Sequence, residues 1–340
     1  MEAVAIVGVV VAAAGADDEE NSMNLLGRRL AARPALSLVF CLMLPFLGLL
    51  PTPALAGTAT LQTTFKSPQD AVDALVAAIK GDKTDTLASI LGQEGQKLAS
   101  SGDPVADEAA RTRFATAYDE GHDLKQEGDA RAVLIVGKDD FPFPIPLVAT
   151  EGAWRFDTAA GAEEILNRRI GENELAAIEV MRAYVDAQRE YAEADRDGKG
   201  DQYARKFVSS EGKKDGLYWR AAAGETDSPL GPLVANARAE GYAARSGHPE
   251  PYHGYLFKIL SAQGDNAAGG ARDYIVHGRM IGGFALVAAP AEYGNSGVMT
   301  FMVNHDGVVF QKNLGPDTLD LVAEMTAFNP DSTWSEVKSE

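Results

Sequence analysis

Cysteine is almost absent from this chain of 340 residues, which contains only Cys41. That residue lies in an apolar stretch near the N-terminus, and we expect this stretch to be removed as part of a signal peptide. The remaining chain would have no thiol, which excludes disulfide bonds, thiol nucleophiles and metal sites built from cysteine. Phe40 precedes Cys41 where a bacterial lipoprotein site needs a small residue, so we expect no lipid anchor.

Positive charge is also scarce. The sequence has 31 lysine and arginine residues against 49 aspartate and glutamate residues, which gives a net charge of −18. An acidic surface repels phosphate groups, so we expect no binding to nucleic acid and no electrostatic attachment to anionic lipid. Apolar residues make up 46% of the chain and charged residues 24%, the composition of an ordinary globular protein.

The common motifs of catalysis and cofactor binding are missing as well. The sequence has neither G-x-G-x-x-G nor G-x-x-x-x-G-K-[ST], the glycine-rich loops that hold phosphate groups, and no G-x-S-x-G nucleophile turn. The nearest match to S-x-x-K is Ser210 with Lys213, in a polar loop. We therefore predict no cofactor-binding residues, leave the catalytic residues unknown, and favour a protein that is not an enzyme.

Residues 23–56 have the three parts of a Sec-type signal peptide. Arginines within residues 28–33 precede an apolar stretch at residues 35–50, which Pro45 interrupts, and Ala-Leu-Ala at residues 54–56 is an A-x-A cleavage site. A membrane anchor would need about 20 uninterrupted apolar residues. The sequence thus predicts cleavage after Ala56, a periplasmic or secreted bacterial protein, and no stable membrane span after cleavage.

Residues 1–22 precede this pattern and carry no positive charge before their apolar run. We interpret them as the product of a mis-assigned start codon, with Met23 as the initiator. Residues 1–56 contain five acidic and three basic residues, so their removal changes the net charge from −18 to −16. The 284 residues that follow are enough to bury a sizeable core without disulfide bonds.

Residues 62–165 are predicted to form an N-terminal α+β domain. Ser67 and Pro68 suit an N-cap and a first helical position, and Gly81 ends the helical spacing that follows. The apolar pattern then predicts two further helices and three strands, at residues 84–91, 106–118, 132–136, 145–149 and 153–156.

Residues 172–328 are predicted to form a C-terminal domain, in which a helix from residue 173 to about residue 194 packs on an antiparallel meander. Leu175, Ile178 and Val185 recur at helical spacing in this segment. Turn residues separate the five expected strands, at residues 255–260, 273–278, 283–290, 298–304 and 307–313. The whole chain is therefore predicted to have an α+β fold.

The segment NHDG at residues 304–307 raises the question of a catalytic His–Asp pair. Asp-Gly between two apolar runs is a strong hairpin signal, because glycine readily adopts positive φ. Adjacent residues in a tight turn point in different directions, whereas a catalytic pair needs the carboxylate on an imidazole nitrogen. We therefore interpret His305 and Asp306 as the corner of a hairpin.

Asp195, Asp197 and Asp201 are spaced in part like the ligands of a calcium loop. The pattern is incomplete, because Lys199 stands at one ligand position and Lys206 stands where the bidentate glutamate belongs. The alternative is a solvated turn between two structural elements, which the missing glutamate favours. Calcium is the one metal ion that the sequence raises as a possible cofactor.

Ring side chains gather in two segments of the second half. Tyr218, Trp219, Tyr252, His253 and Tyr255 lie near glycine-rich loops and could line a ligand groove. The alternative, which the sequence favours, is that the aromatic rings fill the core between helix and sheet.

The five histidines show neither H-x-H nor H-E-x-x-H spacing. His248 and His253 bracket a short proline-rich stretch and could bind a metal ion together with Glu250. That stretch is stiff and extended, so an ordinary loop or a recognition surface is the favoured interpretation.

Three segments together resemble the bacterial domain-of-unknown-function family 2950 (DUF2950), namely residues 213–242, 251–264 and 280–315. The resemblance covers most of the chain that follows the predicted signal peptide. It implies an exported bacterial protein and carries no established activity.

The C-terminal half is also similar to the globular heads of type IV pilin-like proteins. The similarity lies in the helix EVMRAYVDAQREYAEAD, the segments YARKF, GYLFKIL and FALVAAP, and the final hairpin. It implies an amphipathic helix on a small antiparallel sheet. The chain lacks a hydrophobic assembly stalk before that helix, so only the fold of the head is carried over.

We therefore predict a cell-envelope protein that binds a partner protein or another envelope component without catalysis. Two alternatives stay open. One is a hydrolase of envelope material that uses an unidentified pair of carboxylates, and the other is a calcium-stabilised adhesion or assembly module.

Overall fold

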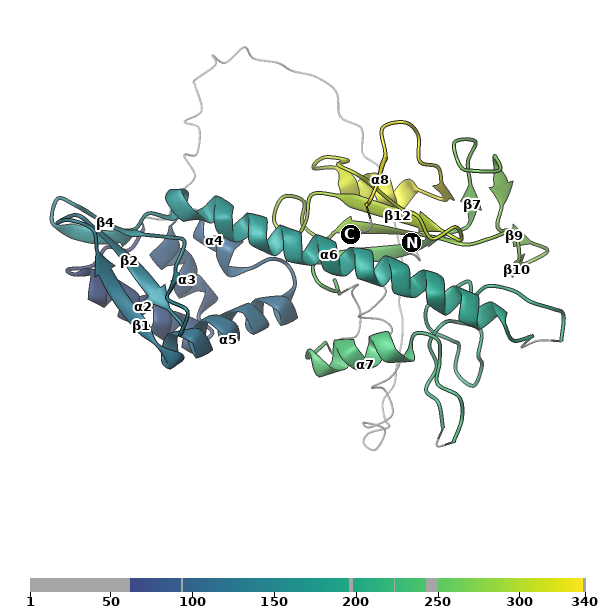
Figure 1. The fold of residues 1–340 in the computed structure, drawn as a ribbon, viewed down its shortest axis with the longest axis horizontal. Coiled ribbons are helices and arrows are strands. Elements are labelled where there is room, and N and C mark those ends of the chain that lie inside the picture. The colour runs from purple at the N-terminus through teal and green to yellow at the C-terminus, as the bar shows by residue number, and fades with distance from the viewer. Residues whose placement is uncertain (1–61, 93, 196–197, 223, 243–249, 339–340) are drawn as a thin grey trace, which may run out of the picture. The chain divides into compact units, whose positions relative to one another are not determined.

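The computed structural model describes residues 62–338 except Gln93, residues 196–197, Ala223 and residues 243–249 (Figure 1). The predicted mis-assigned start and signal peptide, residues 1–56, lie outside the described residues. The described chain combines helices with antiparallel sheets, which confirms the predicted α+β fold class.

Helices open the described chain as predicted. The Ser67 side chain accepts a hydrogen bond from the Asp70 amide, Pro68 occupies the first turn, and Gly81 ends the helix. These local signals fix both ends of the first helix, and the second helix has the predicted bounds. The four helices are α2 (Pro68–Lys80), α3 (Thr84–Leu91), α4 (Gly95–Ala99) and α5 (Pro104–Glu120).

An antiparallel sheet follows, with the order β1-β2-β4-β5 and β3 paired to β2. Leu75 and Ile90 of the helices pack with Leu134 and Phe156 of the sheet in one buried cluster. The first strand was not predicted, because its sequence HDLKQ is polar and four of its five residues are exposed. The strands are β1 (His122–Gln126), β2 (Arg131–Val136), β3 (Phe141–Pro142), β4 (Leu147–Thr150) and β5 (Ala153–Phe156).

The long helix α6 (Thr158–Ala192) has 35 residues and begins 15 residues before the predicted start. The prediction missed its first four turns because they carry Gly161, Gly171 and several charges instead of a regular apolar stripe. The helix runs without a break through the predicted boundary between residues 165 and 172. The division of the chain into two separately folding domains stays a prediction. In the described residues, no helix is both long and apolar enough to cross a membrane.

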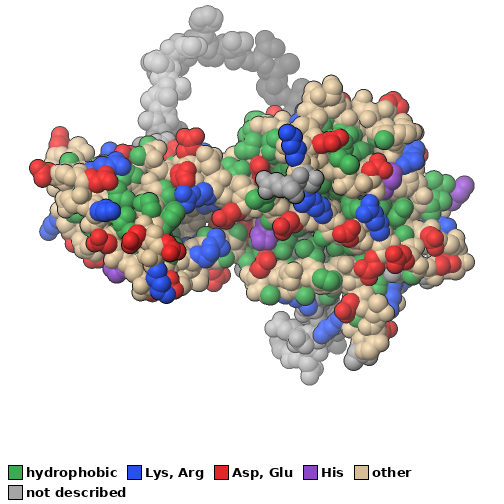
Figure 2. Space-filling view, viewed as in Figure 1, with side chains coloured by type: hydrophobic (Ala, Val, Ile, Leu, Met, Phe, Trp, Pro, Cys, Tyr) green, Lys and Arg blue, Asp and Glu red, His purple; other side chains and the backbone are tan. Residues whose placement is uncertain are grey.

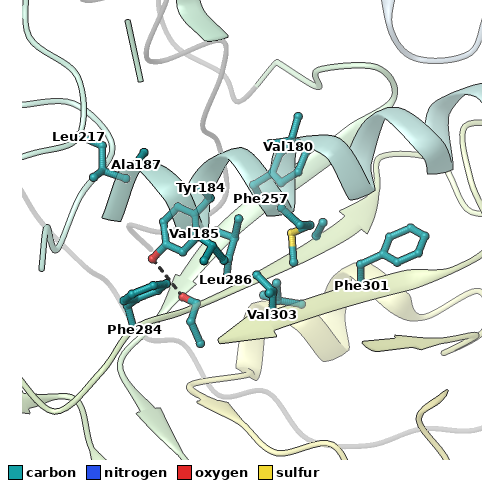
Figure 3. Packing of buried hydrophobic residues seen from close by; sticks show 14 of the residues in the cluster. Val180, Tyr184, Val185, Ala187, Leu217, Phe257, Phe284, Leu286, Phe301 and Val303 are labelled. Carbon is teal, nitrogen blue, oxygen red and sulfur yellow. Dashed lines mark hydrogen bonds between the residues drawn. The ribbon is translucent and has the colours of Figure 1, made fainter. Parts of the chain in front are cut away.

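The C-terminal half is built on a five-stranded antiparallel sheet with the order β15-β13-β12-β11-β6. Every residue of its central strands β11 and β12 is buried. Tyr184 and Val185 of α6 lie beside Phe284 and Leu286, and the Tyr184 hydroxyl is 3.4 Å from the Ala285 carbonyl (Figure 3). The strands are β6 (Tyr255–Leu260), β11 (Ala285–Pro290), β12 (Thr300–Asn304), β13 (Val309–Lys312) and β15 (Ser335–Glu336).

One predicted meander strand, residues 273–278, is wrong. The chain leaves the main sheet between β6 and β11, and His277 and Gly278 form a tight turn with φ values of 51° and 78°. Before the turn, Asp273 pairs with β7 in one sheet whereas Ile275 and Val276 pair with β10 in another, so residues 273–278 do not form one strand. The short strands here are β7 (Ala262–Gln263), β8 (Arg272–Asp273), β9 (Ile275–Val276) and β10 (Arg279–Met280), and β14 (Ala327–Phe328) pairs with β7.

Two shorter helices complete the described chain, α7 (Gly231–Ala239) and α8 (Thr318–Glu324). Val234 of α7 and Val322 of α8 join the same hydrophobic cluster as the inner face of α6. Lys258, in the middle of β6, is buried and its Nζ donates to the carbonyls of Val322 and Ala323 at the end of α8.

Candidate functional site

A cleft of about 380 Å³ lies where α6 ends. Three separate segments meet there. They are the last turn of the helix, the loop that ends at Tyr203, and Ile281 directly after β10. Its lining residues are Arg189, Ala192, Glu193, Asp201, Gln202, Tyr203 and Ile281.

Backbone pairing holds the far wall of the cleft in place. The Tyr203 amide donates to the Met280 carbonyl at 2.8 Å, which joins the loop after α6 to β10. The Tyr203 ring packs edge-on against Phe284, with 4.7 Å between ring centroids. Ile281 follows Met280 in the chain and is 44% exposed, so it offers an apolar contact among polar lining residues.

The charged groups of the cleft are only partly engaged with the protein. Arg189 donates from Nη2 to the His305 carbonyl at 3.2 Å, and its Nη1 lies 3.7 Å from Asp186. Glu193 and Asp201 are exposed, and their carboxylates make no hydrogen bond or ion pair with other described residues. The cleft therefore presents a guanidinium and two carboxylates that can still bind a ligand.

His305 contacts one cleft residue through its carbonyl, which accepts from Arg189. Arg272 Nη2 is 2.8 Å from His305 Nε2, and the ring meets Tyr274 and Phe284 edge-on. Burial lowers the pKa of His305, with Asp306 opposing and Arg272 reinforcing the shift. A neutral ring accepts from Arg272 through Nε2.

The hairpin interpretation of residues 304–307 is confirmed. Strands β12 and β13 pair on either side of the turn, and Gly307 has a φ of 84°. Asp306 and Asn304 bond to each other, with the Asp306 amide 3.1 Å from the Asn304 side-chain oxygen. The closest approach of His305 Nε2 to an Asp306 oxygen is 3.8 Å, too long for the hydrogen bond of a catalytic pair.

The proposed calcium ligands are only partly described. Asp197 lies outside the described residues, Asp195 accepts the Lys199 amide at 3.0 Å, and Asp201 lines the cleft. Among the described residues, no three His, Cys, Asp or Glu side chains are placed to share a metal ion. Calcium binding stays a prediction, and a calcium-dependent change in Tm is its test.

The predicted aromatic groove residues lie in the interior. Tyr218, Trp219, Tyr252 and Tyr255 are each at most 9% exposed and belong to the large hydrophobic cluster. His253 is more open, and its Nε2 lies 3.0 Å from Glu240. This placement favours the core-filling alternative, and ligand contact by these residues stays a prediction.

The Ser210 side chain pairs with a lysine other than the one its motif spacing suggested. Lys206 Nζ lies 2.6 Å from Ser210 Oγ and 2.8 Å from Asp215. Burial raises the pKa of Asp215, but hydrogen bonds from Lys206 and Ser210 outweigh it and hold the pKa below its usual range. The Ser210 hydroxyl is therefore bonded to Lys206 and Asp215, and the S-x-x-K spacing with Lys213 is not the pairing that the fold makes.

The remaining histidines do not meet one another in the described chain. His248 lies outside the described residues, His122 Nδ1 is 2.9 Å from the Tyr118 carbonyl, and His277 is in the β9–β10 turn. The predicted site with His253 and Glu250 therefore stays a prediction.

A second hollow, between α2 and α5, differs in its electrostatics. It has about 350 Å³, and four of its five charged residues pair with each other, Lys80 with Asp119 at 2.5 Å and Arg111 with Asp82 at 2.8 Å. The cleft at the end of α6 keeps its opposite charges apart, and we take it as the candidate site.

The fold defines an α+β protein with a small cleft of mixed polar and apolar lining. The chain belongs to the family described as "Protein of unknown function (DUF2950)", whose sequence model matches residues 62–337. This confirms the resemblance found in the sequence. No curated protein matches the chain, and no solved structure matches it either, so the similarity to pilin-like heads stays a prediction.

Proposed function

We propose that this chain is an exported cell-envelope protein that binds a partner or an envelope component without transforming it. The observation that carries the proposal is the cleft at the end of α6, where a guanidinium, two carboxylates and the exposed Ile281 line one concave surface. Small-ligand sites combine an apolar contact with a few placed polar groups in this way. The signal-like sequence at residues 23–56 supports export.

Export is tested by expressing the full chain in a bacterium and sequencing the N-terminus of the protein recovered from the periplasm. We expect the mature protein to begin at Gly57. A protein that stays in the cytoplasm with residues 23–56 attached would contradict the proposal.

Binding is tested with a matched pair of variants. Ile281 in the cleft and Leu319 in α8 are exposed to similar extents, 44% and 38%. We expect an envelope component to be recovered with the wild type and with Leu319→Ser, and to be lost with Ile281→Ser. Equal recovery of the envelope component with both variants would show that the cleft does not bind it.

One observation favours a second candidate, the hydrolysis of envelope material. Glu193 and Asp201 place two carboxylates on the same cleft, and glycoside hydrolysis uses two carboxylates on either side of the bond. A hydrolase would release soluble fragments from purified envelope, and Glu193→Gln or Asp201→Asn would abolish the release. Unchanged release by both variants, or no release by the wild type, would leave the binding role alone.

A further inference from the structure

We infer that the cleft at the end of α6 binds a dipolar ligand, a short peptide with a free ammonium, a free carboxylate and an apolar side chain. This inference rests on the proposed binding function and specifies its ligand class. Ligand sites commonly have volumes of about 300–1,000 Å³, so a cleft of about 380 Å³ suits a ligand of one or two residues.

The ammonium end is assigned from the negative end of the helix. α6 ends at Ala192, and the carbonyl dipoles of its last turn favour a positive charge there. Glu193, the C-cap, and Asp201 add two carboxylates without partners in the described chain. Acidic side chains gather on the face shown in Figure 2 around the end of α6. An ammonium group can be held there by charge-assisted hydrogen bonds.

The carboxylate end is assigned to Arg189, one turn earlier on the same helix. A guanidinium has five N–H donors, and the contacts of Arg189 with the His305 carbonyl at 3.2 Å and with Asp186 at 3.7 Å leave donors available. Gln202 accepts from Arg279 through Oε1 at 3.3 Å, which leaves its amide N–H groups to donate. Both groups can bind the oxygens of a carboxylate.

The spacing of the two charges is itself informative. Arg189 and Glu193 are four residues apart on a helix, a spacing at which opposite charges commonly pair. They do not pair here, because the guanidinium is directed to the His305 carbonyl instead. The positive and negative walls thus stay apart, with room for a ligand between them.

The apolar part of the ligand is assigned to Ile281 and Tyr203. Ile281 is one of few large apolar side chains that stay exposed among the described residues, and Phe284 holds the Tyr203 ring in place. Together with Ala192 they give an aliphatic side chain a surface to cover, and removing that apolar surface from water favours binding.

Other small ligands suit the cleft less well. A divalent cation would be attracted to the two carboxylates but repelled by Arg189, and a phosphate would be attracted to Arg189 but repelled by the carboxylates. A ligand with both charges complements both walls. An apolar side chain then distinguishes a peptide from other dipolar molecules.

The probe is the dipeptide leucyl-leucine, with N-acetyl-leucyl-leucine and leucyl-leucine amide as analogues that lack one charge each. We expect calorimetric titration of the purified protein to show binding of the dipeptide, and binding at least tenfold weaker for each analogue. Equal affinity for all three, or no binding of the dipeptide, would overturn the inference.

Variants assign each end of the ligand. Arg189→Gln should weaken dipeptide binding about tenfold and leave the already weak binding of the amide unchanged. Asp201→Asn should weaken dipeptide binding and leave the N-acetyl analogue unchanged. Glu190→Gln is the matched control, because Glu190 is exposed on α6 but does not line the cleft. Losses that do not follow this pattern would contradict the assignment.

The two proposals fail in distinguishable ways. If the dipeptide does not bind but recovery of an envelope component still depends on Ile281, the ligand class is wrong and the binding function stands. If neither dipeptide binding nor recovery of the envelope component depends on the cleft residues, the ligand class and the binding function are both wrong.

Discussion

The hydroxyl of Tyr242 donates a hydrogen bond of 2.8 Å to Asp103, although 139 residues separate them along the chain. Asp103 also caps α5 by accepting from the Val105 and Ala106 amides, and it accepts from the Gly254 amide at 3.0 Å. The carboxylate is 1% exposed and each of its oxygens has two donors. One buried side chain thus joins the start of α5 to the chain before β6.

We expect Tyr242→Phe to lower the free energy of unfolding by about 1.5–3 kcal/mol, because a hydrogen bond to a buried charge is lost. Tyr293→Phe is the control, since its hydroxyl bonds to Asn313 at the surface and its loss should cost at most about 0.5 kcal/mol. Urea denaturation measures both. Similar losses for the two variants would mean that the Asp103 contact adds no stability.

Gly161 lies where α6 passes close to the loop before β4. A Cβ at this position would sit 2.8 Å from the Cα of Ile145, and the backbone cannot move aside as a side chain could. We expect Gly161→Ala to destabilise the protein by roughly 1–3 kcal/mol. The measurement is the midpoint of thermal unfolding.

Gly171 in the same helix is the matched control for Gly161. No atom lies within 4 Å of a Cβ built at Gly171. Alanine is a better helix former than glycine by about 0.5–1 kcal/mol, so Gly171→Ala should stabilise the protein. If both variants shift Tm in the same direction, the close approach at Gly161 does not matter.

His305 should make stability depend on pH. Burial is the main cause that lowers its folded-state pKa below the ordinary value of about 6.5, so the unfolded chain binds the proton more tightly. The stabilisation is complete above about pH 6.5 and is lost as the pH falls from there through the folded-state pKa. Protonation would also set a positive ring against Arg272.

Urea denaturation between pH 5 and pH 8 checks this dependence. In His305→Gln, an amide can still accept from Arg272 but does not titrate, so the difference in stability from the wild type should shrink as the pH falls. A difference that is the same at every pH would show that His305 does not contribute.

Lys258 should stabilise the sheet through the end of α8. Lys258→Met keeps an apolar stem of similar length but removes the donor from the carbonyls of Val322 and Ala323. We expect a loss of about 1–3 kcal/mol in the free energy of unfolding. Lys125→Met, on the exposed strand β1, should stay within about 0.5 kcal/mol of the wild type. An equal effect of both changes would contradict the role of Lys258.

Sequence patterns predicted those elements whose signals are local. The cap at Ser67, the stop at Gly81 and the Asp-Gly turn at residues 306–307 each act within a few residues, and the structure has them where expected. The predictions failed where pairing with another element, and not a local signal, decides the conformation. Strand β1 is polar and forms because β2 offers a sheet edge.

The cleft could not be predicted from sequence patterns either. Of its lining residues, the sequence singled out only Asp201, and for calcium. Arg189 and Glu193 belong to an ordinary charged helix face, and Ile281 stands between Met280 and two glycines. None of these residues indicates a site in the sequence alone, because only folding brings residues 189–193, 201–203 and 281 together.

The sequence by itself determined the α+β class, the family, the ends of α2 and α3 and the final hairpin, because capping, spacing and turn chemistry are short-range. The tertiary structure alone decided that Arg189 turns to the His305 carbonyl and that Asp103 meets Tyr242. Those outcomes depend on packing between segments 100 or more residues apart, where the cost of burying a polar group selects its partner.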